Sequence, residues 1–255
     1  MSSSGVVIRL LGPFQIFKMG QPVSLRSGGK TEQLLSALAL RPRVGVHRAT
    51  LVEHIWPNVP LSLASQSLNT LMHSLKAQLA DALAGQPPIV HTRNYYSLNL
   101  TGGVTVDVLE FESAATVGRR LHSEGSTAAA IESYERAVAL YGGDLAAGSD
   151  ISELLERERL RATCLTTLAR LADAHFELEN YEEACESALR LLAVDACRED
   201  AHRMVMRAYV RSGARAQALR QYQLCRSILR DEFDAVPEPA TERLFDLIRT
   251  DPGRV

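Results

Sequence analysis

The pattern of apolar and polar residues divides the first hundred positions into short elements. Three stretches rich in β-forming side chains come first, separated by turn residues such as Gly20-Gln21, at residues 6–11, 14–18 and 22–25. They predict a small antiparallel sheet. Apolar residues then recur at helical spacing in three segments, residues 30–40, 48–56 and 63–83. We therefore predict three amphipathic helices after the sheet.

A hairpin is predicted directly after the third helix. Residues 89–92 and 95–100 are extended stretches that flank Arg93-Asn94, and asparagine tolerates the positive φ that a two-residue hairpin turn requires. Two helices followed by a two-stranded hairpin is the element order of a winged helix-turn-helix. Residues 50–100 therefore indicate a DNA-binding fold.

From residue 107 onward the pattern is almost purely helical. Positions 12 residues apart pair as Gly118 with Ala130, Ala172 with Ala184, and Met206 with Ala218. The last two units are offset by 34 residues, the period of a tetratricopeptide helix pair, and about 20 extra residues separate the first two. We interpret the charged run at residues 153–161 in this interruption as a solvated helix face, with a binding site as the alternative.

The predicted fold class is therefore mixed. An α+β winged helix-turn-helix domain over residues 1–103 is followed by an all-α domain of tetratricopeptide-like helical repeats over residues 104–255.

The charge of the chain is unevenly distributed between these halves. Residues 1–100 carry nine Lys/Arg against three Asp/Glu, a balance of +6, whereas the remainder has a balance of −8. A basic module joined to an acidic one suits a nucleic-acid reader attached to a protein-contacting domain. The start of the chain lacks a signal-peptide pattern, and no apolar run approaches the length of a membrane span, so we expect a cytoplasmic protein. The four cysteines have no metal-ligand spacing and are expected to be structural thiols.

The third predicted helix carries the candidate base-reading side chains. If its apolar stripe, centred on Leu68, faces the core, a polar face lies opposite, formed by Gln66, Asn69, Thr70 and His73. Amide, hydroxyl and imidazole groups pair with base edges in a major groove. The alternative is an ordinary solvated face.

Phosphate contacts must come from basic side chains around that helix. The candidates are Lys30, Arg48, Lys76 and Arg93, with Arg41 and Arg43 as further possibilities. Arg93 is the preferred candidate because a basic hairpin tip reaches an adjacent groove or the DNA backbone. Each arginine is equally well explained as a plain surface residue.

No catalytic pattern accompanies these residues. The histidines and cysteines form no metal-ligand cluster, no nucleophile motif appears, and the segment around Lys30-Thr31 lacks the glycine that a phosphate-binding loop requires. We therefore expect no enzyme activity, no metal and no cofactor. Trp56 is expected to anchor the core.

The chain also resembles a known family over nearly its whole length. The motifs are Lys30-Thr31-Glu32-Gln33-Leu34-Leu35, Leu51-Val52-Glu53-His54-Ile55-Trp56, Tyr96-Ser97-Leu98, Val106-Asp107 with Phe111, Tyr141-Gly142-Gly143-Asp144, Ala218-Leu219 with Tyr222, and Pro237-Glu238-Pro239-Ala240-Thr241. They resemble the Streptomyces antibiotic regulatory protein (SARP) family, whose halves are an OmpR-type winged helix and a bacterial transcriptional activation domain. The resemblance implies a transcriptional activator that binds repeated promoter sequences as a homodimer and contacts RNA polymerase.

Two other functions fit the same pattern. The weak charge of the third helix is compatible with a helical-repeat adaptor whose winged domain docks proteins instead of DNA. A ligand-gated regulator that binds an unknown small molecule in the repeat domain is the other alternative.

Overall fold

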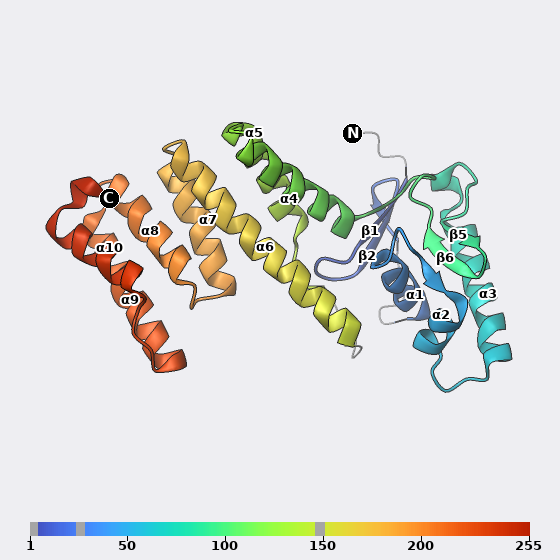
Figure 1. The fold of residues 1–255 in the computed structure, drawn as a ribbon. Coiled ribbons are helices and arrows are strands. Elements are labelled where there is room, and N and C mark those ends of the chain that lie inside the picture. The colour runs from blue at the N-terminus through green and yellow to red at the C-terminus, as the bar shows by residue number, and fades with distance from the viewer. Residues whose placement is uncertain (1–4, 24–28, 146–150) are drawn as a thin grey trace. The chain divides into compact units, whose positions relative to one another are not determined.

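The computed structural model describes residues 5–23, 29–145 and 151–255. The chain forms two compact units, which are described separately (Figure 1). Unit 1 comprises residues 1–111 and 140–157, and unit 2 comprises residues 112–139 and 158–255. The domain boundary between residues 103 and 104 stays a prediction, since this division by contacts falls at other positions.

A four-stranded sheet opens unit 1. Its strands run in the order β3-β2-β1-β7 and span Gln21–Pro22 (β3), Gln15–Lys18 (β2), Val6–Arg9 (β1) and Val104–Val106 (β7). The first three pair in antiparallel fashion as predicted, although residues 24 and 25 of the predicted third stretch lie outside the described residues. The sequence did not reveal β7, which pairs in parallel with β1.

Three helices follow the sheet close to their predicted positions. They are α1 (Lys30–Ala39), α2 (Arg48–Ile55) and α3 (Leu61–Leu79), with a 3₁₀ turn at Asp81–Leu83 where the third helix was expected to continue. Most inward residues of the three helices are buried as their spacing predicts, including Leu38, Ile55 and Leu68, whereas Leu71 and Met72 of the predicted stripe on α3 are only half-buried. Trp56, which is expected to anchor the core, follows α2 and is partly buried.

The hairpin completes a second sheet. Strands β5 (Ile89–Thr92) and β6 (Tyr95–Leu98) pair in antiparallel fashion around Arg93 and Asn94, whose φ values of 49° and 69° are both left-handed. Two left-handed residues form the turn that matches the twist of a tight hairpin. A short strand that the sequence did not reveal, β4 (Val46–His47), pairs with β6 on the other side.

Backbone segments far apart in sequence approach closely beside β1. Asp107 is 3% exposed, and its carboxylate accepts hydrogen bonds from the backbone N–H groups of Leu10 and Leu11, at 2.9 Å each. The loop at Tyr141-Gly142-Gly143-Asp144 passes so near that a Cβ atom on Gly12 would lie 3.2 Å from the Gly142 backbone. Cβ atoms on Gly142 and Gly143 would likewise lie 3.0 Å from the Leu11 carbonyl oxygen and 3.3 Å from Gly12 Cα, so glycine at these positions permits backbone packing that side chains would prevent.

The regular elements of unit 2 among the described residues are all helices. The helices that contribute to it are α4 (Asp107–Ser123), α5 (Thr127–Leu140), α6 (Ile151–Glu177), α7 (Tyr181–Val194), α8 (Glu199–Arg211), α9 (Arg215–Phe233) and α10 (Pro239–Thr250). Ala172 and Ala184 lie in one buried cluster between α6, α7 and α8, while Met206 and Ala218 lie in a second cluster that reaches α10. The predicted helix-pair repeats are therefore present.

The first repeat shows why a small residue is needed between paired helices. A Cβ atom on Gly118 would lie 2.5 Å from the ring of Tyr134, which is completely buried. The charged run in the interruption is not simply solvated as predicted. Glu153 forms an ion pair with His54 in unit 1, and Arg159 pairs with Glu112 in unit 2 at 2.6 Å.

The cysteines are free thiols, and Cys164, Cys185 and Cys225 are buried. Burial raises the pKa of Cys225 to about 12, which keeps this thiol protonated and unreactive at neutral pH. Among the described residues, no helix has the length and apolar character needed to cross a membrane.

We expect unit 2 to lose stability in mild acid because of His202. This ring is 1% exposed and lies between the Ala196 carbonyl oxygen, 2.9 Å from Nε2, and the Gln221 amide nitrogen, 2.7 Å from Nδ1. Burial lowers its pKa below the ordinary value of about 6.5. The unfolded chain therefore binds a proton that the folded chain resists, and stability falls as pH drops below about 6.5.

Urea unfolding followed by circular dichroism at pH 7.5 and 5.5 measures this effect. His202→Gln should weaken the pH dependence, whereas the control His73→Gln, at an exposed position, should leave it unchanged. Equal pH dependence in wild type and His202→Gln would contradict the assignment.

Candidate nucleic-acid interface

The polar face of α3 is open to solvent. Gln66, Asn69, Thr70 and His73 are all exposed, as is Lys76 in the last turn, while Leu68 and Leu75 on the opposite face are buried. The Thr70 hydroxyl donates a hydrogen bond to the Gln66 carbonyl oxygen at 3.1 Å, which fixes its rotamer on the helix surface. The structure thus brings the predicted base-reading residues together on one face.

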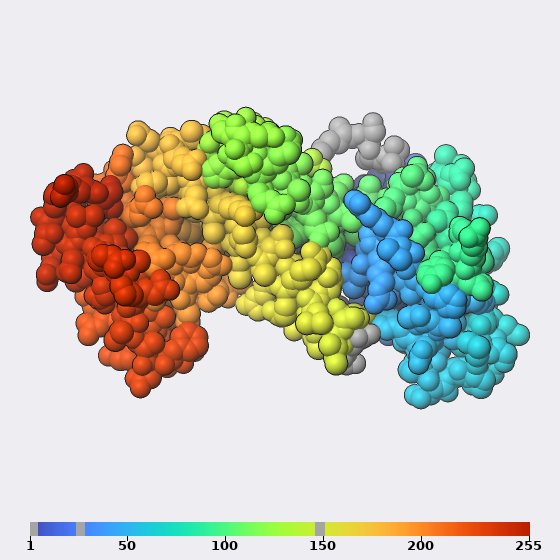
Figure 2. Space-filling model, in the orientation of Figure 1, coloured from blue at the N-terminus to red at the C-terminus, as the bar shows by residue number. Residues whose placement is uncertain are grey.

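The tip of the hairpin lies at the surface of the same unit. In Figure 2, α3 is cyan and the hairpin is green, and both are exposed on unit 1. Arg93 at the turn is exposed, and its guanidinium has no hydrogen bond or ion pair to any residue that the structure describes. The two tyrosines behind it alternate as a strand requires, with Tyr96 5% and Tyr95 46% exposed.

Arg48 connects α2, α3 and the hairpin. Its Nη2 donates to the Ser65 carbonyl oxygen and to Asn69 Oδ1 at 3.0 Å each, and its Nη1 donates to the Tyr96 hydroxyl. Sequence reasoning assigned Arg48 to a DNA phosphate. In the structure its N–H groups already donate hydrogen bonds within the protein, and one of the acceptors is Asn69, a predicted base-reading residue.

Lys30 is also occupied within the protein. Its Nζ donates to the carbonyl oxygen of Ile55 at the end of α2 and to Gln33 Oε1, and it lies 6.0 Å from the centre of the Trp56 ring. A cation at a helix C-terminus compensates the free carbonyl groups there. Lys30 therefore has a structural role that the sequence did not indicate. Unlike Arg48, it forms no hydrogen bond with Asn69.

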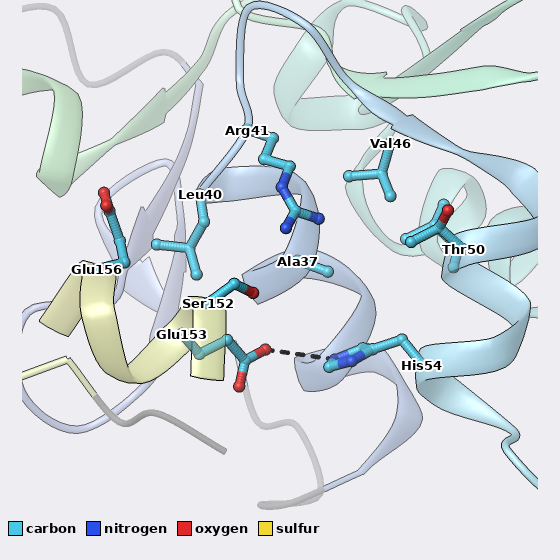
Figure 3. A pocket seen from close by; sticks show the side chains of 10 residues that line it. Ala37, Leu40, Arg41, Val46, Thr50, His54, Ser152, Glu153 and Glu156 are labelled. Carbon is cyan, nitrogen blue, oxygen red and sulfur yellow. Dashed lines mark ion pairs between the residues drawn. The ribbon is translucent and has the colours of Figure 1, made fainter. Parts of the chain in front are cut away.

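Arg41 lines a cavity of about 300 Å³ that lies within unit 1 (Figure 3). Its walls come from the α1–α2 region and the first turns of α6, and His54 and Glu153 face each other across one end at 3.4 Å. Arg43, two residues along the loop, is exposed. Of the two further phosphate candidates, Arg41 lines this cavity and Arg43 does not.

His47 is a structural residue beside the candidate interface that sequence reasoning missed. It caps α2, since its Nδ1 accepts a hydrogen bond from the Ala49 backbone N–H at 3.3 Å, and its ring meets Tyr95 edge-on at 5.2 Å. It therefore sets the start of α2 and the adjacent position of Arg48. A polar residue before an apolar helix was the available signal.

The part of the chain that the structure describes contains no cluster of His, Cys, Asp and Glu able to hold a metal ion. In unit 2, a cavity between α6, α7 and α8 measures about 70 Å³, well below the size of ordinary small-molecule sites, about 300–1,000 Å³. This cavity gives no support to a small-molecule site in the repeats.

The chain thus combines an α+β unit that carries a helix and a hairpin with an all-helical unit of tetratricopeptide-like pairs. Residues 106–249, more than half of the chain, match the family model described as the bacterial transcriptional activator domain. The chain belongs to this family, and its similarity to SARP-type regulators agrees with the resemblance that its motifs indicated. The curated relatives that match are regulatory proteins.

Individual relatives agree with this assignment. The regulatory protein AfsR of Streptomyces coelicolor is 26% identical over 247 residues, which are 96% of this chain and 24% of AfsR. The transcriptional regulatory protein MoaR1 of Mycobacterium bovis is 23% identical over an alignment of 256 positions, gaps included, that covers 97% of this chain and 80% of MoaR1. This chain therefore spans about a quarter of AfsR but most of MoaR1.

A solved structure shares the fold. Mycobacterium tuberculosis EmbR, determined in complex with a low affinity phosphopeptide, aligns with a TM-score of 0.74 and 20% identity. The alignment covers 96% of this chain and 65% of EmbR. The mixed fold class predicted from the sequence is confirmed.

Proposed function

We propose that this activator binds double-stranded promoter DNA in a sequence-specific manner through α3 and the hairpin. The observation that carries the proposal is the exposed polar face of α3 in the same unit as an exposed arginine at a tight hairpin tip. A helix fits the major groove, where amide, hydroxyl and imidazole groups meet base edges. Gln66, Asn69, Thr70 and His73 would contact bases.

Basic side chains would supply the attraction to phosphates. Lys76 lies on α3 and Arg93 on the hairpin, and both are exposed, whereas Lys30 and Arg48 would reach phosphates only by giving up some of their contacts within the protein. Phosphate contacts dominate affinity and its salt dependence.

Pairing of two copies on DNA is part of the proposal. Lys76 is the only cation on the predicted reading face of α3, so one copy gains little electrostatic attraction from that helix. Contact between two copies on adjacent promoter repeats would link their two binding events, and this link would raise the affinity of the pair above that of one copy. The acidic second half, with its balance of −8, would contact RNA polymerase, and the protein would act in the cytoplasm.

Two substitutions separate base reading from phosphate attraction. His73→Ala is expected to change preference at one base pair by about 1–3 kcal/mol. Arg93→Ala is expected to weaken binding to most sequences and to reduce the slope of log affinity against log salt by about 0.9 for each phosphate that the variant no longer neutralises. Gel-shift titrations at two salt concentrations, on duplexes with one or two copies of a selected site, measure both effects.

Arg220→Ala is the matched control, because Arg220 is an exposed arginine in unit 2. It should leave the salt slope unchanged. Unchanged affinity in both His73→Ala and Arg93→Ala would refute the residue assignment, and equal binding per copy on one-site and two-site duplexes would refute pairing. Failure to retain any duplex, together with capture of protein partners, would favour the adaptor function instead.

A further inference from the structure

The amide of Asn69 is held in one orientation by Arg48. The guanidinium can only donate hydrogen bonds, so the atom of Asn69 that faces it at 3.0 Å must be the oxygen, Oδ1. The second bond from the same Nη2, to the Ser65 carbonyl oxygen one helical turn earlier, fixes the guanidinium against α3. The Asn69 amino group, Nδ2, is therefore left as the polar group available on the exposed face.

The position of Arg48 is itself fixed from the hairpin side. Its Nη1 donates to the hydroxyl of Tyr96, whose ring is 5% exposed and stacks on His91 with ring centres 4.6 Å apart. Arg48 thus stands between a buried strand residue and the α3 backbone. Such a side chain resists rotation when a ligand arrives, because three separate acceptors hold it.

We propose that Asn69, positioned by Arg48, reads a hydrogen-bond acceptor on a base edge and so selects guanine over adenine at its contact. The inference rests on the proposed DNA-binding function. Guanine presents two acceptors in the major groove, O6 and N7, whereas adenine presents the N7 acceptor and the N6 amino donor.

Adenine is selected against for an electrostatic reason. The usual pairing of asparagine with adenine needs Oδ1 to accept from the N6 amino group while Nδ2 donates to N7. With a guanidinium 3.0 Å from Oδ1, an approaching amino group meets a positive charge beside its acceptor. The guanine acceptors O6 and N7 can instead accept hydrogen bonds from Nδ2, and the nearby positive charge of Arg48 attracts these acceptor atoms.

Randomised duplex selection with the full chain tests this inference. Wild type is expected to enrich guanine at the contacted position, with a preference over adenine on the order of tenfold in competition titrations. Asn69→Asp keeps the size of the side chain and an acceptor for Arg48 but turns the reading group into an acceptor. This variant should lose the guanine preference and favour cytosine, whose N4 amino group donates.

Arg48→Met tests the positioning role. It releases Oδ1, so adenine should rise relative to guanine, whereas a purely structural role for Arg48 would weaken binding to all four base pairs equally. Arg220→Met, which removes the charge of an exposed arginine in unit 2, is the control and should keep the guanine preference. Thermal melting of each variant verifies that it is folded. If Arg48→Met unfolds, the base preference of Asn69→Asp compared with wild type decides the test, because Asn69 is exposed and its substitution should leave the fold intact.

The outcomes separate this inference from the proposed function. If wild type selects a sequence and Asn69→Asp retains the same preference at every position, the inference is wrong and DNA recognition stands. If wild type selects no sequence at all, the proposed function fails and the inference fails with it.

Discussion

Asp107→Ala is expected to lower the free energy of unfolding of unit 1 by about 3–5 kcal/mol. The substitution removes the acceptor for the buried N–H groups of Leu10 and Leu11, which then have neither a protein partner nor water. Leaving a buried donor unpaired costs about 1–3 kcal/mol for each group. It also removes the bond to the Val108 N–H in the first turn of α4.

Trp56 gives a direct measurement, because it is the only tryptophan in the chain and lies in unit 1. Urea unfolding followed by its fluorescence should shift to lower urea for Asp107→Ala. Asp107→Asn, which keeps one acceptor oxygen, should shift less. The control is Asp81→Ala, which breaks an exposed ion pair with Lys18 and should change little. Coincident transitions for wild type and Asp107→Ala would contradict the role of this carboxylate.

The elements of the fold were predictable where local physics decides them. The spacing of Leu34, Leu38 and Leu68 indicated amphipathic helices, and Asn94 indicated a hairpin turn with positive φ, because both signals lie within a few residues of the element itself. The 34-residue offset of Ala184 and Ala218 likewise reflects a repeated local packing requirement.

The missed elements depend on partners far away in sequence. Strands β4 and β7 have two and three residues, too few for a periodic signal, and each exists because it pairs with a distant strand, as Val104 does with Val6. The buried carboxylate of Asp107 accepts hydrogen bonds from Leu10 and Leu11, which lie 97 and 96 positions earlier in the chain. A single sequence shows the polar residue but not the donors that make its burial favourable.

The candidate interface divides in the same way. The exposed face of α3 followed from helical periodicity, since a buried stripe at Leu68 and Leu75 leaves Asn69 and His73 outside. The contacts of Arg48 did not follow, because its partners lie 17, 21 and 48 residues away and meet only in the folded unit. Basic charge made Arg48 a phosphate candidate, which stays a prediction, and the structure adds that its guanidinium binds the Asn69 amide oxygen.

Gly45→Ala is expected to destabilise unit 1 by about 3 kcal/mol, through two separate costs. Gly45 has a φ of +71°, where a side chain costs about 1–2 kcal/mol. The added Cβ would also lie 2.6 Å from the backbone carbonyl oxygen of Tyr96, so β4 and β6 must move apart. Overpacking of this kind costs about 1–3 kcal/mol.

Gly85→Ala isolates the first of these costs. Gly85 has a similar φ of +81°, but a Cβ atom there meets nothing within 4 Å, so this variant bears only the cost of the left-handed backbone. Trp56 fluorescence during urea unfolding should therefore rank wild type above Gly85→Ala and Gly85→Ala above Gly45→Ala. Because the displaced strand carries His47 and leads into Arg48, Gly45→Ala should also weaken discrimination between DNA sequences, measured by competition gel shift. Equal stability of the two variants would contradict the second cost, because it would mean that a Cβ atom on Gly45 is accommodated beside the Tyr96 carbonyl oxygen without loss of stability.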